Sequence, residues 1–150
     1  MNLVIGSDHA GYRLKVRLIQ WLQSATGGHH QVRDLGCNGA NSCDYPDFAM
    51  AVARTVARGR SSRGLLICGT GIGMAMTANK IRGVRAAVSW NPQTAFLAAE
   101  HNHANVLCIP SRYVSPQKAR GMIRSFLRAP YGRGRHARRV GKIKKLERSV

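Results

Sequence analysis

The stretch that decides the fold is Leu65-Leu66-Ile67-Cys68-Gly69-Thr70-Gly71-Ile72-Gly73. Its apolar start predicts a buried strand, and the glycine-rich turn that follows predicts the beginning of a helix. Glycine lets the main chain approach a ligand closely, so N–H groups in such a turn can hold a phosphate or a developing oxyanion. Cys68 adds a potential nucleophile or base at the start of the turn. The stretch therefore predicts an active-site loop at the end of a strand.

Strand and helix patterns alternate along the rest of the chain. Short apolar runs have the length expected of strands buried on both faces; they occupy residues 3–5, 32–35, 65–68, 86–89 and 106–109. Helical patterns lie between and after them, at residues 14–22, 48–56, 73–80, 92–100 and 119–127. Parallel strands need crossover connections, so this order predicts an α/β fold in which helices cover both faces of a five-stranded parallel sheet.

Length and composition fit one globular domain. The chain has 150 residues, of which 44% are hydrophobic and 20% charged, enough to bury a substantial core. We expect a single domain over 1–150, with an α/β core at 1–130 and a basic extension, a helix or an arm, at 131–150. No apolar run approaches the roughly 20 residues that cross a bilayer. The first run ends at Gly6 and is no secretory signal, so we expect a cytoplasmic protein without a membrane partner.

The cysteines and the charge narrow the choice of ligands. Cys37, Cys43, Cys68 and Cys108 show neither paired spacing nor matching histidines, so neither a zinc site nor a structural disulfide is expected.

The formal charge of +18 indicates an anionic partner. Residues 128–150 carry nine Arg or Lys against one acid, and the rest of the chain still holds fifteen basic and five acidic residues. The tail lacks interleaved aromatics, so we expect salt-sensitive association with nucleic acid at most, not specific recognition.

Polar side chains follow the predicted strands at the points where the strands end. Ligands of parallel α/β folds bind beyond these carboxyl ends, near a switch in strand order. Each residue also has a purely structural interpretation: Asp8 as a helix cap, His9 as a surface residue, Cys68 as a core thiol. Their convergence at one edge favours a site. The residues are Ser7, Asp8, His9, Asp44, Tyr45, Cys68, Thr70, Ser111 and Arg112.

A set of motifs, in order from about residue 3 to about residue 140, resembles the ribose-5-phosphate isomerase B family. The motifs are Gly6-Ser7-Asp8-His9-Ala10-Gly11, Asp44-Tyr45-Pro46, Cys68 to Gly73 with Ala78-Asn79-Lys80, His101-Asn102, Ser111-Arg112 and Gly134-Arg135-His136-x-x-Arg139. The family also includes galactose-6-phosphate isomerase. The resemblance implies a Rossmann-like three-layer fold that dimerises, and interconversion of aldose and ketose phosphates without metal or organic cofactor.

The resemblance also implies roles for single residues. Cys68 matches the base that removes the carbon-bound proton, and loop amides at a helix N-terminus favour its thiolate. The amides of Gly69, Gly71 and Gly73 could hold the oxyanion, and Thr70 could move a proton between O1 and O2. Ring opening would fall to His101 with Asp8 nearby, and Asn102 would donate to a sugar oxygen. The substrate-binding positions that remain are Tyr45 and, for the phosphate, His9, Arg112, Arg135 and Arg139.

The expected reaction is the interconversion of ribose 5-phosphate and ribulose 5-phosphate through a cis-enediolate, a step of the pentose phosphate pathway. A 6-phosphohexose such as allose 6-phosphate or galactose 6-phosphate is the alternative substrate. Galactose-6-phosphate isomerase divides its catalytic residues between two unlike chains, whereas this chain holds the whole set, which favours the pentose. A nucleotide-binding or nucleic-acid-binding module is the non-enzyme alternative. Two features argue against nucleotide binding. The spacing Gly69-x-Gly71-x-Gly73 is not GxGxxG, and no acidic residue that could bind a ribose follows the loop before Glu100.

The order of the motifs also predicts how the chain assembles. His101 and Asn102 precede the fifth strand and should lie at the amino edge of the sheet, whereas Asp8, Cys68 and Thr70 should lie at the carboxyl edge. We therefore expect a homodimer, alone or as a dimer of dimers, whose active sites are shared between subunits. His103 follows the His-Asn motif and could repel His101 when both are protonated. Without the resemblance, His101 could simply be a histidine placed favourably at a helix C-terminus.

Overall fold

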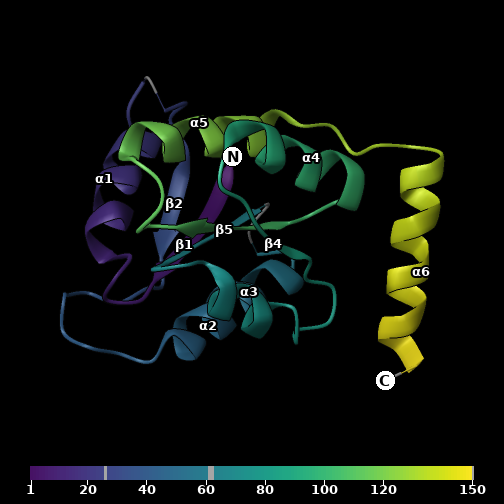
Figure 1. The fold of residues 1–150 in the computed structure, drawn as a ribbon, viewed down its shortest axis with the longest axis horizontal. Coiled ribbons are helices and arrows are strands. Elements are labelled where there is room, and N and C mark those ends of the chain that lie inside the picture. Colours follow the sequence, from purple (N-terminus) through teal and green to yellow (C-terminus); the bar gives the residue numbers. More distant parts are fainter. Residues whose placement is uncertain (26, 61–62, 150) are drawn as a thin grey trace.

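The computed structural model describes residues 1–25, 27–60 and 63–149, and strands and helices alternate along them (Figure 1). The strands are β1 (Asn2–Ser7), β2 (Gln31–Asp34), β3 (Arg63–Cys68), β4 (Ala86–Val88) and β5 (Val106–Pro110). The helices are α1 (Tyr12–Gln23), α2 (Tyr45–Ala57), α3 (Ile72–Ala78), α4 (Pro92–Asn102), α5 (Pro116–Arg128) and α6 (Arg135–Ser149). The predicted alternation is confirmed.

The five strands form one parallel sheet in the order β2-β1-β3-β5-β4. The chain leaves β1 toward β2 on one side and returns to add β3 on the other. The switch in strand order therefore falls between β1 and β3, which pair with Ile5 opposite Leu65. The predicted Rossmann-like architecture is confirmed, and the loops after β1 and β3 flank the crevice where such folds bind ligands.

Alternate residues of the central strands divide the core into two layers. Ile5, Ile67 and Ile109 point to one face, under α1, α4 and α5, and Val4 and Leu66 point to the other, under α2 and α3 (Figure 1). Burial on both faces, predicted for all five strands, is confirmed for β3 and β5 and for nearly all of β1. The prediction is wrong for β2 and β4, which form the edges of the sheet. An edge strand has a neighbouring strand on one side only, so its residues are less fully covered. Most of β2 is exposed, and β4 is half-buried.

Two of the predicted helix starts show their capping contacts. The side chain of Asn91 accepts a hydrogen bond from the N–H of Thr94 at 2.8 Å, with Pro92 in the first turn of α4. Ser115 caps α5 in the same way, through the N–H of Lys118. Asn79, from one of the sequence motifs, bonds both backbone polar groups of Ala86 at 2.8 and 2.9 Å, so it holds β4 beside the end of α3.

The basic C-terminal segment forms α6, which stands beside the core rather than on a face of the sheet (Figure 1). The segment that leads into α6 is held against α4 by Gly132, whose N–H donates to the Glu100 carbonyl at 2.8 Å. Arg63 also contacts the Tyr131 hydroxyl. Along α6, Val140 is buried, whereas 48% of Ile143 and 65% of Leu146 are exposed. Residue 150 of the predicted extension lies outside the described residues, and the division at residue 130 stays a prediction.

None of the helices in the described ranges is long and apolar enough to span a membrane.

Candidate active site

The loops that follow β1, β3 and β5 are joined by hydrogen bonds at the carboxyl edge of the sheet. The N–H of Asp8 donates to the Ile67 carbonyl at 3.2 Å, which connects the ends of β1 and β3. The Oγ of Ser111 lies 3.0 Å from the carbonyl oxygens of both Ala10 and Cys68. These contacts position the side chains of three loops around one crevice, the place that the strand order predicts for a ligand.

Cys68 ends β3 at this crevice, with only 5% of its surface exposed. Its Sγ accepts a hydrogen bond from the N–H of Gly71 at 3.1 Å. Gly71 has a φ of 76°, a left-handed conformation that residues with a Cβ rarely adopt. This hydrogen bond fixes the position of the Cys68 sulfur in the crevice.

Two side chains pack against the glycine-rich loop. A Cβ placed on Gly69 would lie 3.0 Å from Nε of Arg112, and one on Gly73 would lie 2.6 Å from the ring of Tyr45. A Cβ at Gly73 would therefore displace the Tyr45 ring, and one at Gly69 would crowd the Arg112 side chain. The loop is thus flanked by a guanidinium and a phenol, groups that can bind phosphate and sugar oxygens.

Asp8 and His9 follow β1 on the same edge. One carboxylate oxygen of Asp8 accepts the N–H of Gly11 at 2.9 Å in the turn before α1, which leaves the other oxygen for a ligand. The interpretation of Asp8 as a helix N-cap is wrong, because α1 begins after Gly11 and has no side-chain cap. The Nδ1 of His9 accepts the N–H of Cys43 at 3.3 Å. Because Nδ1 is the acceptor, the hydrogen of the neutral ring sits on Nε2, which can donate to an anion. Thr70 is half-buried, and its Oγ1 accepts the N–H of Ile72 at 3.3 Å.

His101 and Asn102 lie at the opposite edge. They end α4, and three residues later the carbonyl of Asn105 accepts the N–H of Gly64 at the start of β3. Gly64 and Cys68 are four residues apart on a strand that rises about 3.3 Å per residue, which separates the two edges by about 13 Å. The predicted separation of His101 and Asn102 from Cys68 is confirmed.

Arg135 and Arg139 belong to the His101 edge, not to the Cys68 edge. Both are exposed on the first turns of α6, four residues apart. His136 lies between them and stacks on His101, with ring centroids 4.1 Å apart. The pKa of His136 is lowered, first by burial and then by the positive charges of His101, Arg135 and Arg139. The Cys68 crevice and the cationic cluster, formed by His101, Arg135, His136 and Arg139, thus lie at opposite edges of the sheet.

His136 has no predicted role of its own, although it stands in the Gly-Arg-His motif. Its stacking depends on how α6 meets α4, which no local pattern indicates. The predicted neighbour of His101 was His103, whose Nε2 instead lies 2.8 Å from the Gly132 carbonyl while its ring stacks on Tyr131. The imidazole that faces His101 is that of His136.

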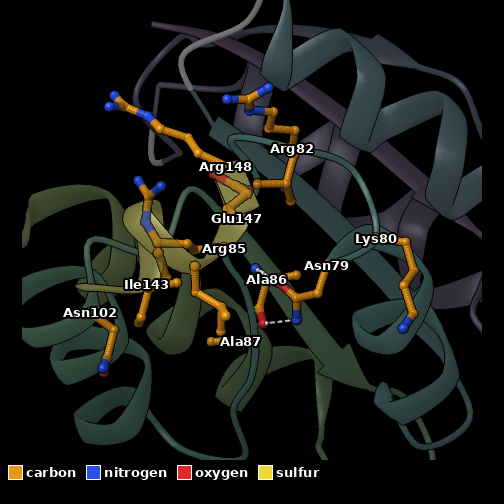
Figure 2. A pocket seen from close by; sticks show the side chains of 13 residues that line it. Asn79, Lys80, Arg82, Arg85, Ala86, Ala87, Asn102, Ile143, Glu147 and Arg148 are labelled. Carbon is orange, nitrogen blue, oxygen red and sulfur yellow. Dashed lines mark hydrogen bonds between the residues drawn. The ribbon is translucent and has the colours of Figure 1, made fainter. Parts of the chain in front are cut away.

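A cavity of about 820 Å³ lies between α6 and the β4 edge, away from Cys68 (Figure 2). Ile143 and Glu147 of α6 face Arg85 and Ala87 across it, and Asn102 lies at its margin. No thiol, carboxylate or histidine of the Cys68 crevice lines it. The crevice at the switch point, with its converging donors, is the better candidate for chemistry. Among the described residues, no group of three His, Cys, Asp or Glu side chains could hold a metal ion.

Known proteins resemble this chain along nearly its whole length. A family model described as Ribose/Galactose Isomerase matches residues 3–143. A probable ribose-5-phosphate isomerase B of Mycoplasma pneumoniae is 44% identical over 97% of this chain and 95% of its own length. The ribose-5-phosphate isomerase B of Escherichia coli is 38% identical over 97% and 96%.

Two solved structures share the fold along their whole length. Ribose-5-phosphate isomerase B of Clostridium thermocellum superposes with a TM-score of 0.95 at 43% identity, covering 99% of each chain. The Mycoplasma genitalium ribose-5-phosphate isomerase B with bound ribulose-5-phosphate gives 0.93 at 42% identity, covering 99% of this chain and 97% of the other.

Proposed function

The chain belongs to the ribose/galactose isomerase family, and on that premise we propose that it interconverts ribose 5-phosphate and ribulose 5-phosphate by proton transfer without a cofactor. The observation that carries the proposal is the Cys68 thiol, held 3.1 Å from the Gly71 N–H at the switch point of the sheet. The relative with bound ribulose-5-phosphate covers nearly the whole chain, which supports the pentose phosphate as substrate.

The chemical step assigned to Cys68 is proton transfer between two carbons. The thiolate removes the proton from C2 of the opened aldose, and the electrons of the broken C–H bond form the C1–C2 double bond of the cis-enediolate. Amides of the loop, at Gly69, Gly71 and Gly73, stabilise the oxyanion. Thr70 moves a proton between O2 and O1, and the Cys68 thiol returns its proton to C1. The thiolate is regenerated and no redox partner is needed.

Ring opening and phosphate binding are assigned to groups on both edges. His101 passes a proton to the ring oxygen, with Asn102 and Asp8 holding sugar hydroxyls. His9 and Arg112 bind the phosphate from the Cys68 edge, and Arg135 and Arg139 bind it from the cationic cluster. Tyr45, which packs against the glycine-rich loop, contacts the sugar. Guanidinium forks suit the paired oxygens of a phosphate.

This division of labour requires a homodimer in our proposal. About 13 Å of strand separates the edges, so His101 and Asn102 of one subunit complete the crevice of the other. The exposed Ile143 and Leu146 of α6 support the dimer, because apolar side chains at this exposure suit a subunit contact. A dimer of dimers is compatible with the same contacts. We place the enzyme in the cytoplasm and in the pentose phosphate pathway, where its substrate is used.

The alternatives are less well supported. The relatives reported above carry the name ribose-5-phosphate isomerase B, so a 6-phosphohexose is not favoured as the main substrate. A nucleotide-binding module is not favoured either, because the family match covers 3–143 and includes the glycine-rich loop.

An isomerase assay tests the proposal. Purified protein with a chelator present is given ribose 5-phosphate or allose 6-phosphate, and ketose formation is followed. We expect turnover of ribose 5-phosphate that the chelator does not change, and a lower kcat/KM for the hexose. A higher kcat/KM for allose 6-phosphate, or no turnover of the pentose, would contradict the proposal.

A further inference from the structure

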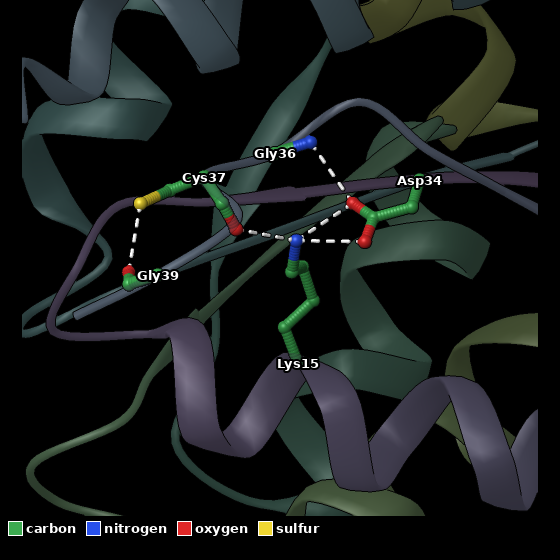
Figure 3. A network of polar contacts seen from close by, with 5 residues as sticks. All are labelled: Lys15, Asp34, Gly36, Cys37 and Gly39. Atoms are coloured by element: carbon green, nitrogen blue, oxygen red, sulfur yellow. Dashed lines mark hydrogen bonds and ion pairs between the residues drawn. The ribbon is translucent and has the colours of Figure 1, made fainter.

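A buried ammonium attaches α1 to the segment that follows β2. Lys15 is fully buried, and its Nζ donates to the two carboxylate oxygens of Asp34 at 2.7 and 2.8 Å and to the Cys37 carbonyl at 2.8 Å (Figure 3). These three acceptors match the three N–H bonds of an ammonium. The N–H of Gly36 donates to Asp34 at 2.9 Å, so the backbone also holds the carboxylate. A charge in the core costs free energy unless it is paired in this way, which keeps the ammonium on its partners.

The backbone that the ammonium holds is also bonded to the end of β1. The N–H of Cys37 donates to the Ser7 carbonyl at 3.0 Å. A Cβ on Gly36 would lie 2.3 Å from the Ser7 nitrogen, so the two stretches of backbone are in direct contact. Ser7 ends β1, and the turn that carries Asp8 and His9 starts there. The position of Cys37 therefore sets where this turn begins.

The far end of the turn is held by the first residues of α1. The N–H of Gly11 donates to a carboxylate oxygen of Asp8 at 2.9 Å, and the N–H of Lys15 donates to the Gly11 carbonyl at 2.9 Å. At the other end, Cys37 joins Ser7 to the ammonium of the same lysine. The Lys15 side chain therefore closes a ring of contacts around residues 7–11.

The segment beyond Cys37 reaches the second site residue of the turn. Residues 35–44 are all described and form neither helix nor strand, so this segment lacks a regular hydrogen-bond ladder. At Cys43 the segment meets His9, because the N–H of Cys43 donates to Nδ1 of the ring at 3.3 Å. That contact keeps the hydrogen of the neutral ring on Nε2, where it can donate to an anion. The anchored end at Cys37 therefore limits how far Cys43 can move from His9.

We infer that Lys15 is a positioning residue of the isomerase: its ammonium holds the turn that carries Asp8 and His9 in the arrangement that binds the substrate. The inference rests on the proposed function, in which Asp8 holds sugar hydroxyls and His9 binds the phosphate. Lys15 does not touch the substrate itself, because its three donors are used by Asp34 and Cys37.

The effect of losing the ammonium should appear in KM rather than in kcat. Cys68 lies on β3, outside the ring of contacts, so its proton transfer is retained once the substrate is bound. Asp8 and His9 hold the substrate both before and during that transfer. A group that binds the ground state and the transition state equally affects KM and leaves kcat unchanged.

Two variants separate positioning from a merely structural role. Lys15→Met removes the donor from the Cys37 carbonyl, whereas Asp34→Asn leaves that donor in place and keeps an oxygen for the Gly36 N–H. Asp34→Asn deprives a buried ammonium of its counter-ion, so it should destabilise the protein more than Lys15→Met does. A structural role makes KM follow the loss of stability. A positioning role makes KM follow the contact with Cys37.

Steady-state kinetics with ribose 5-phosphate compare these two variants with wild type and with Gly59→Ala, a remote change that strains the backbone at a φ of 67°. We expect KM to rise about fivefold in Lys15→Met with kcat retained, the factor of one lost orienting hydrogen bond, and to stay near the wild-type value in the others. A KM that is highest in Asp34→Asn, a KM equal in Lys15→Met and Gly59→Ala, or a loss confined to kcat overturns the inference. If Lys15→Met does not fold, the double variant Lys15→Met/Asp34→Asn, which removes both charges, takes its place.

Amide hydrogen exchange followed by NMR tests the ring of contacts independently of activity. The N–H groups of Gly11 and Cys37 report on it, because they donate to Asp8 and Ser7. We expect both to exchange about tenfold faster in Lys15→Met than in Gly59→Ala, which loses stability elsewhere. Equal exchange rates in the two variants overturn the inference. If wild type does not turn over ribose 5-phosphate, the proposed function fails, while the exchange rates still decide whether Lys15 holds the turn.

Discussion

The imidazole of His136 stacks on that of His101, with centroids 4.1 Å apart and ring planes inclined by 11°. Glu100 lies beside them, 3.2 Å from Nε2 of His101. The stack joins the first turn of α6 to the last turn of α4, so the cationic cluster exists only while α6 is docked. Protonating both rings would place like charges in contact.

The lowered pKa of His136 predicts that acid weakens the folded state. Burial and its positive neighbours oppose protonation in the folded chain, so the folded pKa lies below the ordinary 6.5. The contribution of the neutral ring is therefore complete above about pH 6.5 and is lost as the pH falls through the folded pKa. We expect Tm to fall between about pH 7.5 and about pH 5.5, and to fall less steeply in His136→Gln. His29→Gln, a change at an exposed histidine, is the control; equal slopes in all three proteins would contradict the prediction.

The Lys15–Asp34 pair predicts unequal effects of removing its two partners. Lys15 is 1% exposed at its side chain and Asp34 is 36% exposed. Asp34→Ala leaves a buried ammonium without its counter-ion and should lower the free energy of unfolding by about 3 kcal/mol. Lys15→Met leaves a partly solvated carboxylate and should lower it by about 1 kcal/mol. Urea denaturation of both variants measures the difference. A larger loss of unfolding free energy in Lys15→Met than in Asp34→Ala would contradict the prediction that the buried ammonium decides the difference.

The backbone of Gly71 predicts a catalytic effect beyond backbone strain. Gly71→Ala forces a Cβ into a φ of 76° and moves the N–H away from the Cys68 sulfur. Gly59→Ala, at a φ of 67° with open space around it, imposes similar strain of about 1 kcal/mol far from the crevice. A Cβ at Gly71 would also lie 3.3 Å from Val88, so we expect Gly71→Ala to lose more stability than Gly59→Ala. Only Gly71→Ala should lose kcat, by about tenfold. A normal kcat in Gly71→Ala would show that the hydrogen bond from the Gly71 N–H to the Cys68 sulfur has no part in catalysis.

The shared site predicts complementation between two defective chains. Cys68→Ala and His101→Ala are each expected to turn over poorly as homodimers. Refolded together in equal amounts, half of the dimers are mixed and hold one intact site in two, which gives about a quarter of wild-type activity. Activity of the mixture that stays at the sum of the two homodimers would show that Cys68 and His101 of the same chain act together.

The fold and the carboxyl-edge crevice could be predicted from sequence because their signals are local. Apolar runs mark strands, Asn91 and Pro92 mark a helix start, and the βα order alone places Asp8 and Cys68 on one edge. The edge positions of β2 and β4 could not be predicted from the sequence. A short apolar run does not show whether its strand has neighbouring strands on both sides or on one. That distinction depends on the strand order.

The residues that prediction missed depend on contacts between distant segments. Lys15 stands beside Leu14 in an apolar helix face, and nothing at helical spacing indicates that Asp34, 19 residues later, neutralises it. The stacking of His136 on His101 and the contact of Cys43 with His9 likewise arise from how loops and α6 pack. Local periodicity carries no information about these pairs.

Replacement of Cys68 tests the central claim most directly. Cys68→Ala is compared with Cys108→Ala, which removes a fully buried thiol from the neighbouring strand β5. Turnover of ribose 5-phosphate and exchange of the C2 proton with deuterated solvent are measured for both. We expect Cys68→Ala to lose more than about a hundredfold in both rates, the scale of a positioned general base, and Cys108→Ala to keep them. Undiminished proton exchange in a folded Cys68→Ala protein would contradict the account.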